Sequence, residues 1–156
     1  MMTPTIEGYL NSSNPQTVVT GANLNALASG SSVLGSAFSN VQADSQGGGF
    51  PLATCKIHLD SMAVSAGGNI LIWFLTASDG SVYEQGGTSV TPLRAPDVIF
   101  NPVAQTAAVD LESPCNVPLC ATIKALVKNN SLGAATPANT NGYVKLYYQT
   151  QQIVQV

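Results

Sequence analysis

Residues 53–60 read ATCKIHLD, with an apolar side chain at every second position. This alternation is typical of a β-strand that buries one face and leaves the other in water. The segment NILIWFLTAS at residues 69–78 is apolar at successive positions instead, which predicts a central strand covered on both faces. A turn at Ala66-Gly67-Gly68 separates the two segments, and together they favour a β-sheet fold.

Shorter apolar runs along the rest of the chain extend this interpretation. The Asp79-Gly80 pair predicts a tight hairpin, because Asp-Gly supplies the positive φ angles of a type I′ turn, with a return strand that begins at Val82 and Tyr83. Helical spacing is confined to one turn at residues 22–28. Further strands are expected at Ser32–Asn40, Val98–Phe100, Ala107–Leu111 and residues 123–128.

The last expected strand, residues 143–150, has two chemically different faces. Val144, Leu146 and Tyr148 fall on one face, and Tyr143, Lys145 and Tyr147 fall on the other. The tail at residues 151–156 is expected to be extended as well. An antiparallel sandwich with its core on the first face would leave the second face exposed.

The length of 156 residues fits one domain. Short strands separated by turns, with no long helical pattern, predict an all-β antiparallel β-sandwich that is jelly-roll-like. Pro4, Gly8, Pro15 and Gly21 interrupt any regular period near the N-terminus. We therefore expect an extended N-terminal arm at residues 1–22, followed by a single β-sandwich domain at residues 23–156.

The chain is poor in charge. Charged residues make up 8% of it, against roughly 25% in an ordinary soluble domain. A surface of neutral polar side chains loses little hydration when another protein covers it, so the composition favours a protein that packs against others. A secreted β domain could share this composition.

Charge and hydropathy also exclude two classes of partner. The net charge is −3 and the five basic residues are scattered singly, so nucleic-acid binding is not expected. No apolar run is long enough to cross a bilayer, and residues 1–10 lack the basic and apolar regions of a signal peptide. These features predict synthesis in a cytoplasm and no membrane association.

The residues capable of catalysis or metal binding are few. The cysteines Cys55, Cys115 and Cys120 lack zinc-site spacing and are interpreted as small buried apolar residues. The single histidine, His58, alternates with apolar residues and could be drawn into a triad with Asp60, but no nucleophile motif accompanies it. The sequence predicts no enzyme, no metal and no cofactor.

Two pairs of acids could supply the carboxylates of a glycosidase, Asp110 with Glu112 and Asp79 with Glu84. Residues 110 and 112 project to the same face of a strand, where solvated surface or a calcium ligand pair is the alternative. Aromatic residues could instead form a sugar-binding platform on a β-sandwich module, with Trp73 expected in the core. The candidates for this platform are Trp73, Tyr83, Tyr143, Tyr147 and Tyr148.

Several motifs follow one another in a particular order. They are LNALASG at residues 24–30, the turn 66–68 before the apolar strand 70–75, SDGSVY at residues 78–83, IKALVKNN at residues 123–130 with Gly133, and residues 142–147. In this order the chain resembles small structural proteins encoded in the virion gene clusters of tailed bacteriophages. It departs from them where Thr76-Ala77 replaces a proline, where Cys115 and Cys120 split a proline-rich approach, and in residues 1–20, which lie outside the match.

The resemblance implies a virion protein, most simply a capsid cement (decoration) protein that binds the major capsid protein and stabilises the shell. The alternatives are a head–tail or tail-surface subunit and, from another class, the carbohydrate-binding module. A shell favours a dimeric or trimeric homo-oligomer, and the resemblance implies no catalytic residues. The arm could add a strand to a neighbour's sheet edge, so the residues expected to contact the partner are Ile6, Tyr9, Leu10, Tyr143 and Tyr147.

Overall fold

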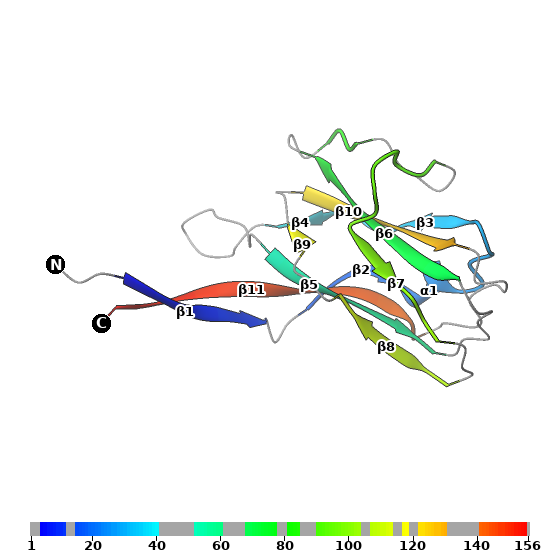
Figure 1. Cartoon of the computed structure of the whole chain (residues 1–156). Coiled ribbons are helices and arrows are strands. Elements are labelled where there is room, and N and C mark those ends of the chain that lie inside the picture. The colour runs from blue at the N-terminus through cyan, green and yellow to red at the C-terminus, as the bar shows by residue number, and fades with distance from the viewer. Residues whose placement is uncertain are drawn as a thin grey trace.

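The computed structural model confirms the predicted all-β sandwich, in which two antiparallel sheets pack face to face (Figure 1). The structure describes residues 4–11, 15–40, 52–60, 68–77, 81–84, 90–103, 107–113, 117–118, 122–130 and 141–155.

The first sheet, sheet A, has the strand order β1–β11–β5–β8, with β2 also paired to β11 and β9 to β5. All of these pairings are antiparallel. Its strands are β1 (Pro4–Asn11), β2 (Gln16–Thr20), β5 (Leu52–Leu59), β8 (Val109–Glu112), β9 (Val117–Pro118) and β11 (Tyr143–Gln155).

The second sheet, sheet B, has the order β3–β10–β6–β7, with β4 also paired to β10. One short helix, α1 (Gly21–Leu24), leads from β2 of sheet A to β3 of sheet B. The strands of sheet B are β3 (Ser32–Leu34), β4 (Phe38–Ser39), β6 (Asn69–Ala77), β7 (Val98–Phe100) and β10 (Thr122–Asn130).

The core lies between the sheets and is built from the alternation read in the sequence. The alternating apolar residues of β5 from Ala53 to Leu59 are fully buried, and Val144 and Leu146 of β11 lie in the same cluster. Sheet B contributes Ile72 and Phe74 of β6 and Val127 of β10. Full burial of one aliphatic side chain stabilises a fold by about 1.5–3 kcal/mol, so this cluster accounts for much of the stability.

The β6 strand is covered on both faces, as its sequence predicts. Ile70, Ile72 and Phe74 face the core between the sheets, whereas Trp73 and Leu75 belong to a second buried cluster with Leu126 of β10. This second cluster lies on the outer face of sheet B, and we call it the Trp73 cluster. Trp73 is therefore buried in the hydrophobic core, as expected, but in the smaller of two core clusters.

The N-terminal segment differs from the prediction. It is extended, but it forms two strands, and Val18 and Val19 of β2 are buried in the core. The expected arm of residues 1–22 therefore contains a strand that belongs to the sandwich. Strand β2 is hard to predict from the sequence because it has only five residues and lies between Pro15 and Gly21. Its pairing with β11 is what holds it in the sheet.

The first strand forms a ribbon with the end of the chain. Strand β1 pairs with the second half of β11, from Asn11 opposite Gln149 to Pro4 opposite Gln155. We call this two-stranded part the β1–β11 ribbon, and it projects beyond the sandwich (Figure 1). The expected extended tail is thus the continuation of β11 to Gln155.

Two further expectations are corrected. The strand expected at Ser32–Asn40 is broken into β3 and β4. The return strand expected at Val82 and Tyr83 is not a strand: residues 81–84 meet β6 through the Glu84 amide, which donates to the Thr76 carbonyl at 3.2 Å. The Asp79-Gly80 turn lies outside the described residues.

The break between β3 and β4 falls at Gly35, where two backbones approach closely. The Gly35 amide donates to the Ala125 carbonyl at 2.8 Å. A Cβ at this position would stand 2.1 Å from the Val18 carbonyl oxygen of β2. Only glycine fits here without moving β2 away from the core.

Replacing Gly35 by alanine should lower the free energy of unfolding by about 1–3 kcal/mol, because the added methyl group overpacks the contact with β2. The change is measured as a lower urea midpoint. The exposed neighbour Ser36 provides the control, since Ser36→Ala should change stability by no more than about 0.5 kcal/mol. Equal midpoints for the two variants would contradict the close approach.

Candidate functional site

The outer face of sheet A gathers charged and aromatic side chains from three strands. Cross-strand partners in an antiparallel sheet lie on the same face. The register places Tyr143, His58 and Asp110 in one row, and Lys145, Lys56 and Glu112 in the next. We call these six residues the polar face of sheet A.

His58 lies between two carboxylates. Its Nδ1 is 3.0 Å from Asp110 Oδ1, and its Nε2 is 3.4 Å from Asp60 Oδ1. The hydrogen bond with His58 holds the pKa of Asp110 below its ordinary value, with a smaller contribution from the charge of Lys56. Asp60 is oriented from its other oxygen, which accepts from the Asn141 amide at 2.8 Å.

Lys56 bridges the two acids of β8. Its Nζ is 3.6 Å from Asp110 Oδ1 and 3.7 Å from Glu112 Oε1. Burial lowers the pKa of Lys56, but the nearby negative charge, led by Asp110, outweighs this and leaves the pKa raised. A glycosidase pairs one carboxylic acid of raised pKa with one ionised carboxylate, so Asp110, whose pKa is lowered, fits only the ionised part. Of the other candidate pair, Asp79 with Glu84, only Glu84 is among the described residues.

The ring of Tyr143 is already in contact with its neighbours. His58 stacks on it with ring centroids 5.2 Å apart and 18° between the planes, and Lys145 Nζ lies 4.0 Å from its centroid. A sugar stacks on an aromatic ring whose face is open to solvent. His58 and Lys145 already contact the ring of Tyr143, so a sugar would have to compete with them for that ring. Tyr147, the next outward-facing tyrosine, is half-buried.

The other aromatic candidates lie elsewhere. Tyr148 faces the core, where it stacks on Phe38 at 5.7 Å, and burial raises its pKa to about 12. Trp73 lies in sheet B, and Tyr83 packs against the Trp73 cluster there. The structure therefore brings Tyr143 and Tyr147 to one face and places the other three aromatic candidates elsewhere.

The residues expected to contact a partner fall into two separate places. Ile6, Tyr9 and Leu10 lie in β1 of the β1–β11 ribbon, opposite residues 150–153 of β11. Tyr143 and Tyr147 lie in the first half of β11, opposite His58 and Thr54 of β5. Strand β11 contacts both sets, but no residue of one set is the cross-strand partner of a residue in the other.

Metal and thiol chemistry find little support. Within the described ranges, no group of three or more His, Cys, Asp or Glu residues could hold a metal ion. Cys55 is buried in the core, and burial raises the pKa of its thiol, which suppresses the reactive thiolate. Cys115 and Cys120 lie outside the described residues. Within the described chain, no helix is both long and apolar enough to cross a membrane.

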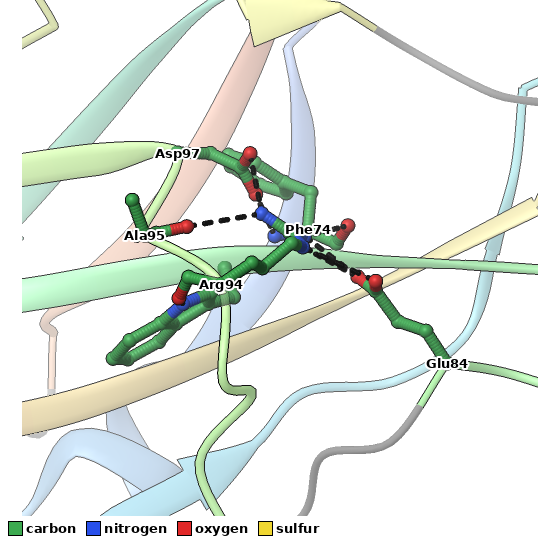
Figure 2. A network of polar contacts seen from close by, with 6 residues as sticks. Phe74, Glu84, Arg94, Ala95 and Asp97 are labelled. Carbon is green, nitrogen blue, oxygen red and sulfur yellow. Dashed lines mark hydrogen bonds and ion pairs between the residues drawn. The ribbon is translucent and has the colours of Figure 1, made fainter.

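A second polar cluster lies on the other sheet and was missed from the sequence. Arg94, the sole arginine of the chain, binds Glu84 through Nη2 at 2.6 Å and through Nε at 3.1 Å. Its Nη1 donates to Asp97 Oδ1 at 2.7 Å, and its Nη2 also donates to the Phe74 carbonyl at 3.1 Å (Figure 2). We call this the Arg94 cluster. The hydrogen bond that Arg94 donates to Glu84 is the main cause that raises the pKa of Arg94.

The Arg94 cluster fastens residues 90–97 to β6. Asp97 Oδ2 accepts from the Phe74 amide at 2.7 Å, and the Arg94 carbonyl accepts from Trp73 Nε1 at 3.1 Å. The segment therefore lies over the Trp73 cluster and satisfies the indole N–H. The signal for this cluster in the sequence is a lone arginine between Pro92 and Pro96. Its side-chain partners Asp97, Glu84 and Phe74 lie 3, 10 and 20 residues away along the chain, so the sequence does not show that they meet.

No protein-family model, no curated protein and no solved structure compared with the chain matches it. Any function of the chain is therefore a proposal that rests on its sequence, its fold and its surface.

Removing the imidazole by His58→Ala should raise the pKa of Asp110 toward its ordinary value of 3.8. A lowered native pKa stabilises the fold at pH values above the unfolded pKa, and this contribution is lost as the pH falls through the native pKa. Carboxyl NMR titration of both proteins measures the shift directly. Thr54→Ala, on the same strand but without a described contact to Asp110, is the control; an unchanged pKa in His58→Ala would contradict the assignment.

Replacing Arg94 by lysine should lower the free energy of unfolding by about 1.5–3 kcal/mol, because lysine keeps the charge but loses the planar fork that reaches Glu84, Asp97 and Phe74 together. Trp73 is the only tryptophan, so its emission should shift to the red as residues 90–97 loosen. Fluorescence and urea denaturation measure both effects. Lys145→Arg on sheet A is the matched control. Wild-type tryptophan emission in Arg94→Lys would contradict the role of Arg94 in holding residues 90–97 against β6.

Proposed function

We propose that the chain is a non-enzymatic structural subunit of a tailed-phage particle that acts as a capsid cement (decoration) protein. In this role it binds the major capsid protein as a dimer or trimer and stabilises the shell. The observation that carries the proposal is the β1–β11 ribbon. A sequence resemblance to small virion proteins supplies the class of particle.

The ribbon has the properties of an assembly element. Among the described strands, β1 pairs only with β11, and beyond Gln149 β11 pairs only with β1. A two-stranded ribbon is marginally stable in water unless further strands or another surface support it. Its edges offer unpaired backbone groups for strand addition. A neighbouring protein that supplies such support would fix both the ribbon and the subunit in place.

The strand pairing supports the finer assignment of a jelly roll. The pairs are nested: β1 and β2 with β11, β3 and β4 with β10, β5 with β8, and β6 with β7. Rolling up one long antiparallel hairpin into two sheets produces this order. Jelly rolls build many viral shells and also lectins, so the topology favours the proposal without deciding it.

The distribution of charge also supports an assembly role. The described carboxylates of Asp110, Glu112, Glu84 and Asp97 are paired with basic side chains in the two clusters. Few isolated ions would therefore have to leave water when a neighbour covers the rest of the surface. A head–tail or tail-surface subunit shares these properties and differs only in its place on the particle.

The test uses shells of the phage that encodes the chain, prepared without this protein. The wild-type chain should co-sediment with the shells at saturable stoichiometry and raise the temperature at which they rupture. Deletion of residues 1–11 removes β1 and should weaken binding at least about tenfold, which corresponds to about 1.4 kcal/mol. Circular dichroism of the deletion variant controls for folding.

The possible outcomes separate the alternatives. Binding to purified tails in place of shells would favour the tail subunit over the cement protein. A chain that stays monomeric and binds neither particle part would overturn the structural role. Wild-type affinity of the deletion variant would remove the ribbon as the anchor.

A further inference from the structure

One stretch of the chain beside sheet B carries the large apolar side chains that are exposed among the described residues. All five large apolar side chains that are exposed among the described residues come from residues 82–103. Leu93 has a relative exposure of 103%, Val82 of 72% and Ile99 of 48%. Exposed apolar side chains that occur singly are ordinary, but their concentration in one segment of a small protein marks an interaction surface.

These side chains border the Trp73 cluster. Ile99 pairs across the sheet with Leu71, which packs against that cluster. Val82 precedes Tyr83, another neighbour of the cluster, and Leu93 precedes Arg94, whose carbonyl binds Trp73. Val82, Leu93 and Ile99 therefore each adjoin a residue that contacts the Trp73 cluster. We call Val82, Leu93 and Ile99, together with Lys124 and Lys128 of β10, the Leu93 face.

Leu93 is held in its exposed position. The hydrogen bonds of Arg94 to Glu84, Asp97 and the Phe74 carbonyl fix the neighbouring residue, and the segment cannot turn Leu93 inward without breaking them. The backbone beside Leu93 is therefore ordered in the free protein, and only the rotamers of the Leu93 side chain have to be fixed when it enters a pocket of a partner.

The charge of this face indicates the chemistry of the partner. Lys124 and Lys128 flank Leu126 on the outer side of β10. Neither forms an ion pair with a described residue, and Lys124 Nζ lies 4.2 Å from the ring centroid of Tyr83. The face thus combines apolar side chains with two lysines that have no carboxylate partner among the described residues, and a complementary surface would be apolar with carboxylates at its edge.

A second copy of the chain supplies this complement poorly. The described carboxylates of Glu84, Asp97, Asp110 and Glu112 are already paired with Arg94 or Lys56. Binding them to another copy's lysines would first break these pairs. A different protein is therefore the better occupant.

We propose that the Leu93 face docks onto an apolar surface of the major capsid protein that is bordered by acidic residues. This inference rests on the proposed function and names the contact by which the subunit recognises the shell. Leu93 enters an apolar pocket, and Lys124 and Lys128 pair with the surrounding carboxylates. The β1–β11 ribbon anchors a different part of the subunit.

The test measures binding of purified variants to the same shells that lack this protein. Leu93→Ser should weaken binding at least tenfold without changing the Trp73 emission, because Leu93 is fully exposed in the free protein. Lys128→Gln should weaken binding severalfold and make it less sensitive to salt. Asn23→Asp, at an exposed position of α1, lowers the net charge by the same amount and should bind as the wild type does.

Each result bears on the inference. Wild-type binding by Leu93→Ser and Lys128→Gln, while the wild-type chain itself binds shells, would overturn the Leu93 face and leave the proposed function standing. Failure of the wild-type chain to bind shells would overturn both. Analytical ultracentrifugation provides the last arm: self-association of the wild type that Leu93→Ser abolishes would identify a second copy as the occupant and contradict the proposal.

Discussion

The hydrogen-bonded pairing along β11 is the constraint on which the rest of the structure depends. One edge of β11 holds β2 and then β1, and the other edge holds β5. This register turns Val144 and Leu146 into the core and therefore turns Tyr143 and Lys145 outward. A slip of one residue would exchange the two faces. The polar face of sheet A thus exists because the core fixes the pairing beneath it.

The two outer faces of the sandwich are built by different means. On sheet A, polar side chains stand directly on the strands, and their exposed ion pairs contribute little to stability. On sheet B, the strands themselves are apolar outward, and a separate segment is tied across them by Arg94. The charges on sheet B therefore position a covering segment, whereas those on sheet A mainly neutralise one another. This difference leaves Lys124 and Lys128 without acidic partners among the described residues.

The sequence predicts the parts of the fold that depend on local pattern. The alternation at residues 53–60 identified β5 and its inward face, the apolar run at residues 69–78 identified β6, and Tyr143 and Tyr147 were assigned to the outward side of β11. Pairing between distant segments has no comparable local signal. The partnership of β1 and β2 with β11, and that of Arg94 with Glu84, follow from the tertiary arrangement. Gly35 gives the same lesson, because the carbonyl that excludes a side chain there belongs to Val18 of another strand. The binding partner stays a prediction.

The pairing of the first strand with the last has a consequence for how the chain acquires its structure during synthesis. Strand β1 cannot find its place until residues 149–155 have left the ribosome. Until then β11 is incomplete, and the backbone N–H and C=O groups of β1 are hydrogen-bonded to water instead of to β11. All-β topologies with such sequence-distant contacts fold slowly. A nascent chain of this kind exposes open strand edges until residues 149–155 have emerged, and chaperones can bind it throughout that time.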